Sequence, residues 1–238
     1  MSATLVGSPR YSALSKEEFQ DLKLIDSSSI ANAIERFHAP FRNEGYTEGS
    51  LVCRYPYMLP MLGYAVTLKV RSASPSSKSR SFFENSDLWN ALLAVPAPRI
   101  LILQDMDRSP GAGALIGEMQ ASVLKTLDCV GVVTNGAVRD VMRIEGVEFQ
   151  MFSGSLSVSQ AHSHVVQVGG QVQIGSLEMA PGDLIHGDSN GIVRIPRELA
   201  SRVPATATAL RKKEEAVMAY CHSPEFSVEG LRDLFAER

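Results

Sequence analysis

The chain has few of the features that mark extracellular or nucleic-acid-binding proteins. Only three of its 238 residues are cysteines. Cys53, Cys129 and Cys221 are far apart and form no C-x-x-C pair, which argues against a zinc knuckle or a disulfide framework. Reduced thiols in a cytoplasmic protein are the simplest interpretation. The net charge is −3 and the longest basic run is Arg211–Lys213, so the positive footprint of a nucleic-acid binder is missing.

Long apolar runs are missing as well. The longest stretch without Asp, Glu, Lys or Arg is 149–177, and its many Ser, Gln, Gly and His residues exclude a membrane span. Residues 1–18 lack the apolar core of a secretory signal. We therefore expect no membrane partner. The length suits one buried core, and we predict a single domain over 1–238, with an N-terminal extension at 1–20 and a C-terminal extension at 221–238.

The pattern of apolar residues predicts an α/β fold. Between 113 and 127 they recur at every fourth position, which is helical spacing. The stretch 147–195 consists of short apolar segments separated by turn formers, and helical sequence at 198–220 is expected to break at Pro204. Further strands are predicted at 63–70, 100–104 and 130–133. We predict a compact layered domain with a central mixed β-sheet flanked by helices, a β-rich second half and C-terminal helices.

Two segments that follow predicted strands carry residues suited to chemistry. Gly113–Gln120 enters a helix, where glycine permits close approach of a ligand and free N–H groups bind anions. Thr134–Asp140 follows the strand at 130–133, and open α/β sheets place ligands at that end of a strand. Arg139 can grip a carboxylate with two hydrogen bonds, and Asp140 is a hard oxygen ligand for Mg²⁺ or Mn²⁺. The alternative is an ordinary surface ion pair between the two.

The spacing of these segments favours a shared site. Twenty residues separate Glu118 from Arg139, which is room for one helix and one strand. Such a crossover brings both loops to the same edge of the sheet. Backbone donors, a guanidinium group and two carboxylates are then expected to converge there.

This arrangement resembles a known family. Gly117-Glu118, followed after twenty residues by Arg139-Asp140 within Gly-Val-Val-Thr-Asn-Gly-Ala-Val-Arg-Asp, is similar to the 4-hydroxy-4-methyl-2-oxoglutarate aldolases, which include the regulator of ribonuclease activity A. The resemblance covers roughly residues 24–215. Supporting matches are Gly63–Thr67, Pro181–Asp183 and Gly187–Val193.

The resemblance implies a class II, metal-dependent aldolase and decarboxylase that acts on a small 2-oxo acid, with Mg²⁺ or Mn²⁺ as cofactor. It implies that Arg139 binds the pyruvoyl carboxylate, that Asp140 binds the metal directly and that Glu118 reaches the metal through water. It also implies a homotrimer or hexamer in which Glu214 or Glu215 of a neighbouring subunit helps to hold the metal's waters. The substrate would lie against Gly117, Glu118, Met119 and Gln120.

Two departures from the family pattern keep other functions open. Arg143 stands where the aldolases tend to have an acidic residue, and Asn32 stands where an early helix often has aspartate. One alternative is a non-catalytic regulator that binds a ribonuclease, and another is an enzyme of the same scaffold with a different acid substrate. The intact Arg139-Asp140 pair favours an enzyme, since the non-catalytic regulators tend to lose this aspartate.

For several other polar residues, a structural role explains the sequence as well as a functional one. His162 and His164 would share one face of an extended strand and suit a metal, but no third ligand follows at a convincing spacing. His186 is expected to be structural, and Asp105 to form either a turn or a pocket edge. The serine-rich segment Ser72–Ser81 is either a mobile loop or an active-site edge.

Overall fold

The computed structural model describes residues 13–37, 44–76 and 86–236. Most of its strands form one nine-stranded sheet in the order β1-β6-β5-β3-β2-β10-β11, with β4 beside β5 and β7 beside β2, and β8 and β9 form a separate pair. The strands are β1 (Val52–Cys53), β2 (Met61–Arg71), β3 (Arg99–Asp105), β4 (Ala114–Ile116), β5 (Cys129–Val138), β6 (Gln150–Leu156), β7 (His164–Val168), β8 (Val172–Ile174), β9 (Leu177–Met179), β10 (Leu184–Asp188) and β11 (Gly191–Ile195).

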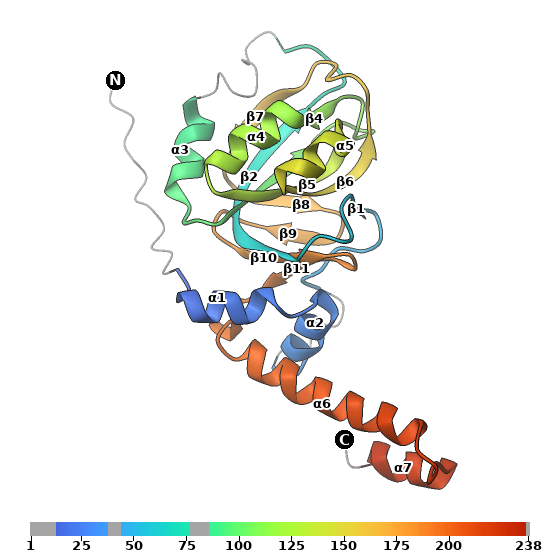
Figure 1. Cartoon of the computed structure of the whole chain (residues 1–238). Helices are drawn as coiled ribbons and strands as arrows, with labels where there is room; N and C mark the ends of the chain where they lie inside the picture. The colour runs from blue at the N-terminus through green and yellow to red at the C-terminus, as the bar shows by residue number, and fades with distance from the viewer. Residues whose placement is uncertain (1–12, 38–43, 77–85, 237–238) are drawn as a thin grey trace.

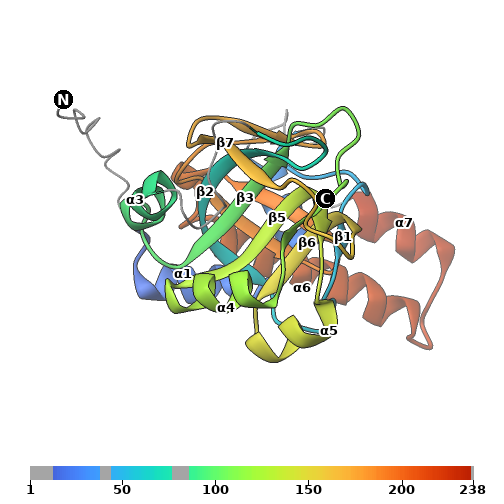
Figure 2. The same cartoon turned by 90° about the horizontal axis from the view of Figure 1, so that it is seen from above.

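The sheet is mixed, as predicted, and curls until it is nearly barrel-shaped (Figure 2). Strands β2, β3, β5 and β6 pair in parallel, while β1, β7 and β10 join them antiparallel. Helices α3, α4 and α5 cover one outer face (Figure 1). The helices are α1 (Lys16–Lys23), α2 (Ser27–Glu35), α3 (Ser86–Ala94), α4 (Glu118–Thr126), α5 (Val141–Ile144), α6 (Val203–Cys221) and α7 (Val228–Ala236), with short 3-10 helices at Glu145–Val147 and Arg197–Leu199.

Strand β2 is buried on both faces, which fixes it in the centre of the molecule. Tyr64, Val66 and Leu68 join the larger core under the helices. Met61 and Ala65 point the other way, into a second core that includes side chains of β8 and β9. Burial of one large apolar side chain stabilises a fold by about 1.5–3 kcal/mol, so both faces of the strand hold it in register.

The predicted helix at 113–127 is shorter than its spacing suggested. Ala114–Ile116 forms β4, which pairs in parallel with β5, and the helix begins only at Glu118. Three consecutive apolar residues that are all buried satisfy a strand as well as a helix. The break expected at Pro204 is found just before it. The 3-10 helix Arg197–Leu199 ends there, and α6 begins at Val203 with Pro204 in its first turn, where proline's missing N–H would have no helical partner.

The predicted C-terminal helices are present and form an arm. Helix α6 packs its first turns near α2 and then extends away from the sheet, with α7 folded back beside it (Figure 1). Among its residues only Val203 and Ala207 are buried, and α7 buries none. The ring of Tyr220 on α6 lies 5.8 Å from that of Phe226 in the connection to α7, and the Ser227 N–H just before α7 donates to the Tyr220 hydroxyl at 3.1 Å. No helix in the described ranges is long and apolar enough to cross a membrane.

A buried histidine anchors α2 to the sheet. His186 on β10 is fully buried, and its Nδ1 lies 3.0 Å from the Ser27 hydroxyl at the start of α2. Asp188 accepts the Ser27 backbone N–H at 2.7 Å. Burial lowers the pKa of His186 from 6.5 to about 4, although the nearby Asp188 charge works in the opposite direction. The structural role expected for His186 therefore fits its surroundings.

We predict that this histidine makes the fold acid-sensitive. Between pH 6.5 and pH 4 the unfolded chain binds a proton that folded His186 does not, so stability rises with pH across this window and is lost as the pH falls through it. Urea unfolding should show roughly 2 kcal/mol less stability at pH 5 than at pH 7 from this group. His186→Asn should remove that difference. His222→Asn, at an exposed position, should retain this difference. An unchanged pH dependence of the unfolding free energy in His186→Asn would show that His186 is not its source.

Candidate active site

Arg139 and Asp140 lie at the carboxyl end of β5, as the sequence predicted. Asp140 has a left-handed backbone, with φ 58° and ψ 28°, and begins the short helix α5. The Arg139 N–H donates to the Ile116 carbonyl at 2.9 Å. This bond joins the end of β4 to the end of β5, so both halves of the motif meet at one edge of the sheet.

The motif brings four charged side chains together. The Glu118 backbone N–H, in the first turn of α4, donates to Asp140 Oδ2 at 3.2 Å. Arg139 Nε lies 3.6 Å from the same oxygen, and Arg143 Nη1 lies 3.4 Å from Glu118 Oε2. The contacts thus run from Arg139 to Asp140, from Asp140 to the Glu118 backbone, and from the Glu118 carboxylate to Arg143.

Gly117 makes this approach possible. A Cβ atom at this position would lie 2.6 Å from Asp140 Oδ2 and 3.0 Å from Arg139 Nε. The Gly117 N–H donates to the side chain of Gln120 at 3.1 Å. The amides of Gly117 and Glu118 are therefore bonded within the protein, and of the four positions expected to cradle substrate, Met119 has the side chain most open to solvent, 61% exposed.

Arg139 retains an unused donor beside the carboxylate. Its Nε is buried and, among the described atoms, has no hydrogen-bond partner, while its side chain as a whole is one-third exposed. Buried polar groups of proteins almost always have a partner, so one without calls for an explanation. The Asp140 carboxylate, 3.6 Å from Nε, is its charge partner beyond hydrogen-bond distance, and the exposed part of the guanidinium group is open to an incoming anion.

The two carboxylates suit a hard metal ion that takes only some of its ligands from the protein. Within the described ranges, no group of three His, Cys, Asp or Glu side chains gathers in a way that could hold a metal. At the motif, the described residues offer two carboxylates, those of Asp140 and Glu118. Mg²⁺ is commonly bound by one or two carboxylates, with waters and substrate oxygens completing its shell. The donor set fits Mg²⁺ or Mn²⁺ and does not fit a closed zinc site.

Tyr55, which the sequence did not single out, holds the turn that carries Asp140. The hydroxyl of buried Tyr55 donates to the Val141 carbonyl at 2.7 Å, next to Asp140. Burial raises the pKa of Tyr55, so the hydroxyl keeps its proton and remains a donor. Tyr55 belongs to a segment rich in turn formers, and no spacing in the sequence links it to the motif.

Asp105 has the turn role rather than the pocket role. It is buried, and its carboxylate accepts the Gly111 N–H at 2.9 Å. Asn135 of the motif accepts the Asp105 N–H at 2.7 Å and donates to the Asp105 carbonyl at 3.0 Å. These bonds tie the end of β5 to the end of β3, so Asn135 positions the motif.

Part of the serine-rich segment is also held in place. The backbone N–H groups of Ser72 and Ala73 both donate to Asp107 at 2.7 Å. Burial raises the pKa of Asp107, but these hydrogen bonds outweigh it and leave the pKa below its ordinary value. Residues 77–81 of the segment lie outside the described residues.

Other predicted candidates lie apart from the motif. His162 precedes β7, and His164 Nδ1 lies 2.7 Å from the His162 carbonyl oxygen, so the two imidazoles do not share a strand face. Glu214 and Glu215 lie on α6, where they pair with Arg211 at 3.7 and 3.2 Å. The fold of one chain does not bring them to Asp140.

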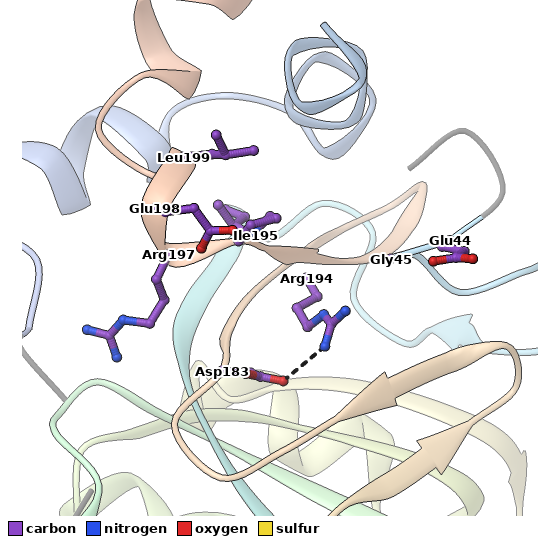
Figure 3. A pocket seen from close by; sticks show the side chains of 9 residues that line it. Glu44, Gly45, Asp183, Arg194, Ile195, Arg197, Glu198 and Leu199 are labelled. Carbon is purple, nitrogen blue, oxygen red and sulfur yellow. Dashed lines mark ion pairs between the residues drawn. The ribbon is translucent and has the colours of Figure 1, made fainter. Parts of the chain in front are cut away.

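A separate cavity of about 420 Å³ adjoins β11. Figure 3 shows Asp183 and Arg194 paired across it at 3.6 Å, with Glu44, Arg197 and Glu198 on its walls. None of the predicted site residues lines it. Its mixed charges give it no preference for an anion or a cation, and the ion pair serves to join the turn before β10 to β11.

Comparison with curated proteins finds distant relatives. A putative 4-hydroxy-4-methyl-2-oxoglutarate aldolase of Halalkalibacterium halodurans is 28% identical over 104 residues, which cover 43% of this chain and 50% of that protein. Protein DlpA of Legionella pneumophila is 24% identical over 174 residues, covering 71% and 27%. The matches thus span half or less of these relatives' own length.

Solved structures share the fold over most of the chain. An uncharacterized protein from Pseudomonas syringae pv. tomato has a TM-score of 0.73 at 17% identity, covering 99% of this chain and 100% of that one. Streptomyces coelicolor RraAS2, an unusual member of the RNase ES inhibitor RraA protein family, has a TM-score of 0.67 at 20% identity, covering 86% and 97%. At such identities the likeness concerns the fold alone.

The family is settled by a match to a family model. The model, described as RraA-like, Aldolase/RraA, matches residues 26–194, which is more than half of the chain. The matched range contains both halves of the motif, Gly117-Glu118 and Arg139-Asp140. The chain therefore belongs to the RraA-like family, which includes aldolases.

Proposed function

We propose that this protein is a divalent-metal-dependent lyase that cleaves a C–C bond next to a 2-oxo acid and releases pyruvate. Its substrates would be 4-hydroxy-4-methyl-2-oxoglutarate-like acids, cleaved by retro-aldol reaction, oxaloacetate, cleaved by decarboxylation, or both. The observation that carries the proposal is the contact of Arg139, Asp140 and Glu118 at one edge of the sheet. Membership of a family with aldolases supports it.

The metal would be held by residues that the motif already brings together. Asp140 would bind Mg²⁺ or Mn²⁺ directly and Glu118 through water. When bound, such an ion polarises the ketone oxygen and lowers the energy of the developing enolate. We further propose that Glu214 or Glu215 of a neighbouring subunit completes the site in a trimer or hexamer. The mass of the protein in solution tests this, and a monomer would contradict it.

The chain's own residues would bind and orient the acid. Arg139 would bind the carboxylate of the pyruvoyl end. Its Nε is buried beside Asp140, which restricts the orientation of the guanidinium group. The electron pair of the breaking bond goes to C3 of the pyruvoyl end, and C3 then takes a proton. The Arg139 charge stabilises the negative charge where it develops.

Two other functions remain as alternatives. A ribonuclease regulator of the same fold would need neither carboxylate, and an enzyme with a different acid substrate would keep the metal requirement. The regulator is distinguished from the proposed lyase by a reaction that depends on the enolate and not on the identity of the natural substrate.

Exchange of the pyruvate methyl protons for deuterium in D₂O is such a reaction. We expect the protein with Mg²⁺ to accelerate the exchange above the buffer rate, EDTA to abolish the acceleration and excess Mg²⁺ to restore it. Proton NMR follows the loss of the methyl signal. A folded protein that does not accelerate exchange with Mg²⁺ or Mn²⁺ would contradict enolate chemistry and favour the regulator.

A further inference from the structure

We propose that Arg143 is a specificity-determining residue that binds the distal carboxylate of a dicarboxylic 2-oxo acid. The inference rests on the proposed lyase function and adds a role for a residue outside the motif itself. Three observations carry it: the attachment of Arg143 to the Asp140 turn, the exposure of its side chain, and the balance of charge around it.

Arg143 is part of the same turn as Asp140. Its backbone N–H donates to the Asp140 carbonyl at 2.9 Å, and the next N–H, of Ile144, donates to the same carbonyl at 3.1 Å. Any ligand held by the Asp140 side chain therefore lies within a turn of helix of the Arg143 backbone. A long flexible side chain at this position can reach the far end of such a ligand.

The Arg143 side chain is open to solvent, whereas Arg139 is mostly covered. Arg143 is 75% exposed and reaches from α5 to Glu118 on α4, while the Arg139 side chain is 33% exposed. An exposed ion pair such as Arg143–Glu118 contributes only about 0–1 kcal/mol. A substrate carboxylate that offers two aligned hydrogen bonds can therefore displace Glu118 from Arg143, and the displacement frees Glu118 for the metal.

The charge of the cluster matches a dianion. Arg139 and Arg143 balance Asp140 and Glu118, so the four side chains sum to zero. A divalent cation then gives the site a charge that the two carboxylates of a dicarboxylic 2-oxo acid neutralise. A monocarboxylic acid would leave one positive charge without a counterpart, so the site favours the diacid by electrostatic complementarity.

The chemistry predicts how this contact affects each reaction. In oxaloacetate decarboxylation the C3–C4 bond breaks, its electron pair stays on C3 and the distal carboxylate leaves as neutral CO₂. Arg143 then stabilises bound oxaloacetate more than it stabilises the transition state. The contact therefore improves substrate binding without raising turnover. In the retro-aldol reaction the C4 hydroxyl loses its proton and the distal carboxylate stays charged, so the contact lasts through the reaction.

The test compares two acids that differ only at the distal end, 2-oxoglutarate and 2-oxopentanoate. Calorimetric titration with Mg²⁺ present measures their binding to wild type, Arg143→Met and Arg143→Lys, with Arg232→Met at an exposed position of α7 as the matched control. We expect Arg143→Met to weaken 2-oxoglutarate binding roughly ten-fold, the loss of one charge-assisted pair, and to leave 2-oxopentanoate unchanged. Arg143→Lys should recover part of the loss.

Kinetics give a second readout that a purely structural role would not move. Arg143→Met should raise the KM for oxaloacetate about as much as it weakens 2-oxoglutarate binding, with kcat equal to or above that of wild type. Equal weakening of both acids, or no weakening of either, would overturn the role of Arg143. If wild type binds neither acid, the lyase proposal itself fails, since binding of the pyruvoyl end that both acids share depends on Arg139 and Asp140.

Discussion

Asp140→Asn is expected to lower kcat/KM for pyruvate release by roughly three orders of magnitude. The substitution keeps the size of the side chain and one oxygen that can accept the Glu118 N–H, but it removes the negative charge that would hold Mg²⁺ or Mn²⁺. Asparagine also tolerates the left-handed backbone that Asp140 adopts. The folded structure should therefore survive, and the unfolding free energy should change by less than about 1 kcal/mol.

Asp128→Asn is the matched control for this variant. Asp128 has nearly the same backbone, with φ 56°, and its exposed carboxylate lies 3.9 Å from Arg99 at the opposite end of β5. The variant should retain the turnover of wild type. Metal affinity, measured by calorimetric titration of Mn²⁺, should fall in Asp140→Asn alone. Equal activity of Asp140→Asn and wild type would place the chemistry elsewhere in the molecule.

Gly117→Ala is expected to lower kcat/KM by roughly a hundred-fold with little effect on the fold. The backbone of Gly117 is extended, with φ −133°, so alanine meets no backbone strain. The added methyl group would stand 2.6 Å from Asp140 Oδ2 and 3.0 Å from Arg139 Nε, and both side chains must move. Displacement of catalytic groups by about 1 Å commonly costs a hundred-fold in rate.

Gly146→Ala provides the comparison, because a Cβ atom there has no neighbour within 4 Å. Gly146 lies close in sequence to α5, so the control also tests general disturbance of this region. We expect it to keep full activity, while steady-state kinetics and urea unfolding separate a local effect at Gly117 from a loss of fold. Similar activity of Gly117→Ala and Gly146→Ala would contradict the tight approach of Arg139 and Asp140.

The sequence predicted the parts of the site that depend on regular spacing. One helix and one strand between Glu118 and Arg139 imply one sheet edge, because parallel crossovers return to the same side. That reasoning placed Gly117, Glu118, Arg139 and Asp140 together without side-chain geometry. The RraA-like family followed from this motif and the mixed sheet from the pattern of apolar residues, and both are found.

The other features of the fold and of the site depend on tertiary contacts, which leave no periodic signal in the sequence. Ala114–Ile116 became a strand because Ala137 and Val138 of β5 extend beyond the pairing with β3 and leave a side free for β4, although its spacing continued the helix. Tyr55 supports the site from a turn-rich segment, through a hydrogen bond to Val141, 86 residues further along the chain. The pairing of Arg143 with Glu118 joins two helices whose relative placement only the folded chain defines.

The most direct test of the central claim is pyruvate release from oxaloacetate above the spontaneous rate. It is measured with Mg²⁺ or Mn²⁺ and again with EDTA, on wild type, Asp140→Asn and Asp128→Asn. The proposed lyase predicts release that needs metal, disappears in Asp140→Asn and persists in Asp128→Asn. Release by wild type that survives EDTA or the loss of the Asp140 charge would contradict a metal-dependent site at Arg139-Asp140, and a wild type inactive with either metal would remove oxaloacetate from the substrates.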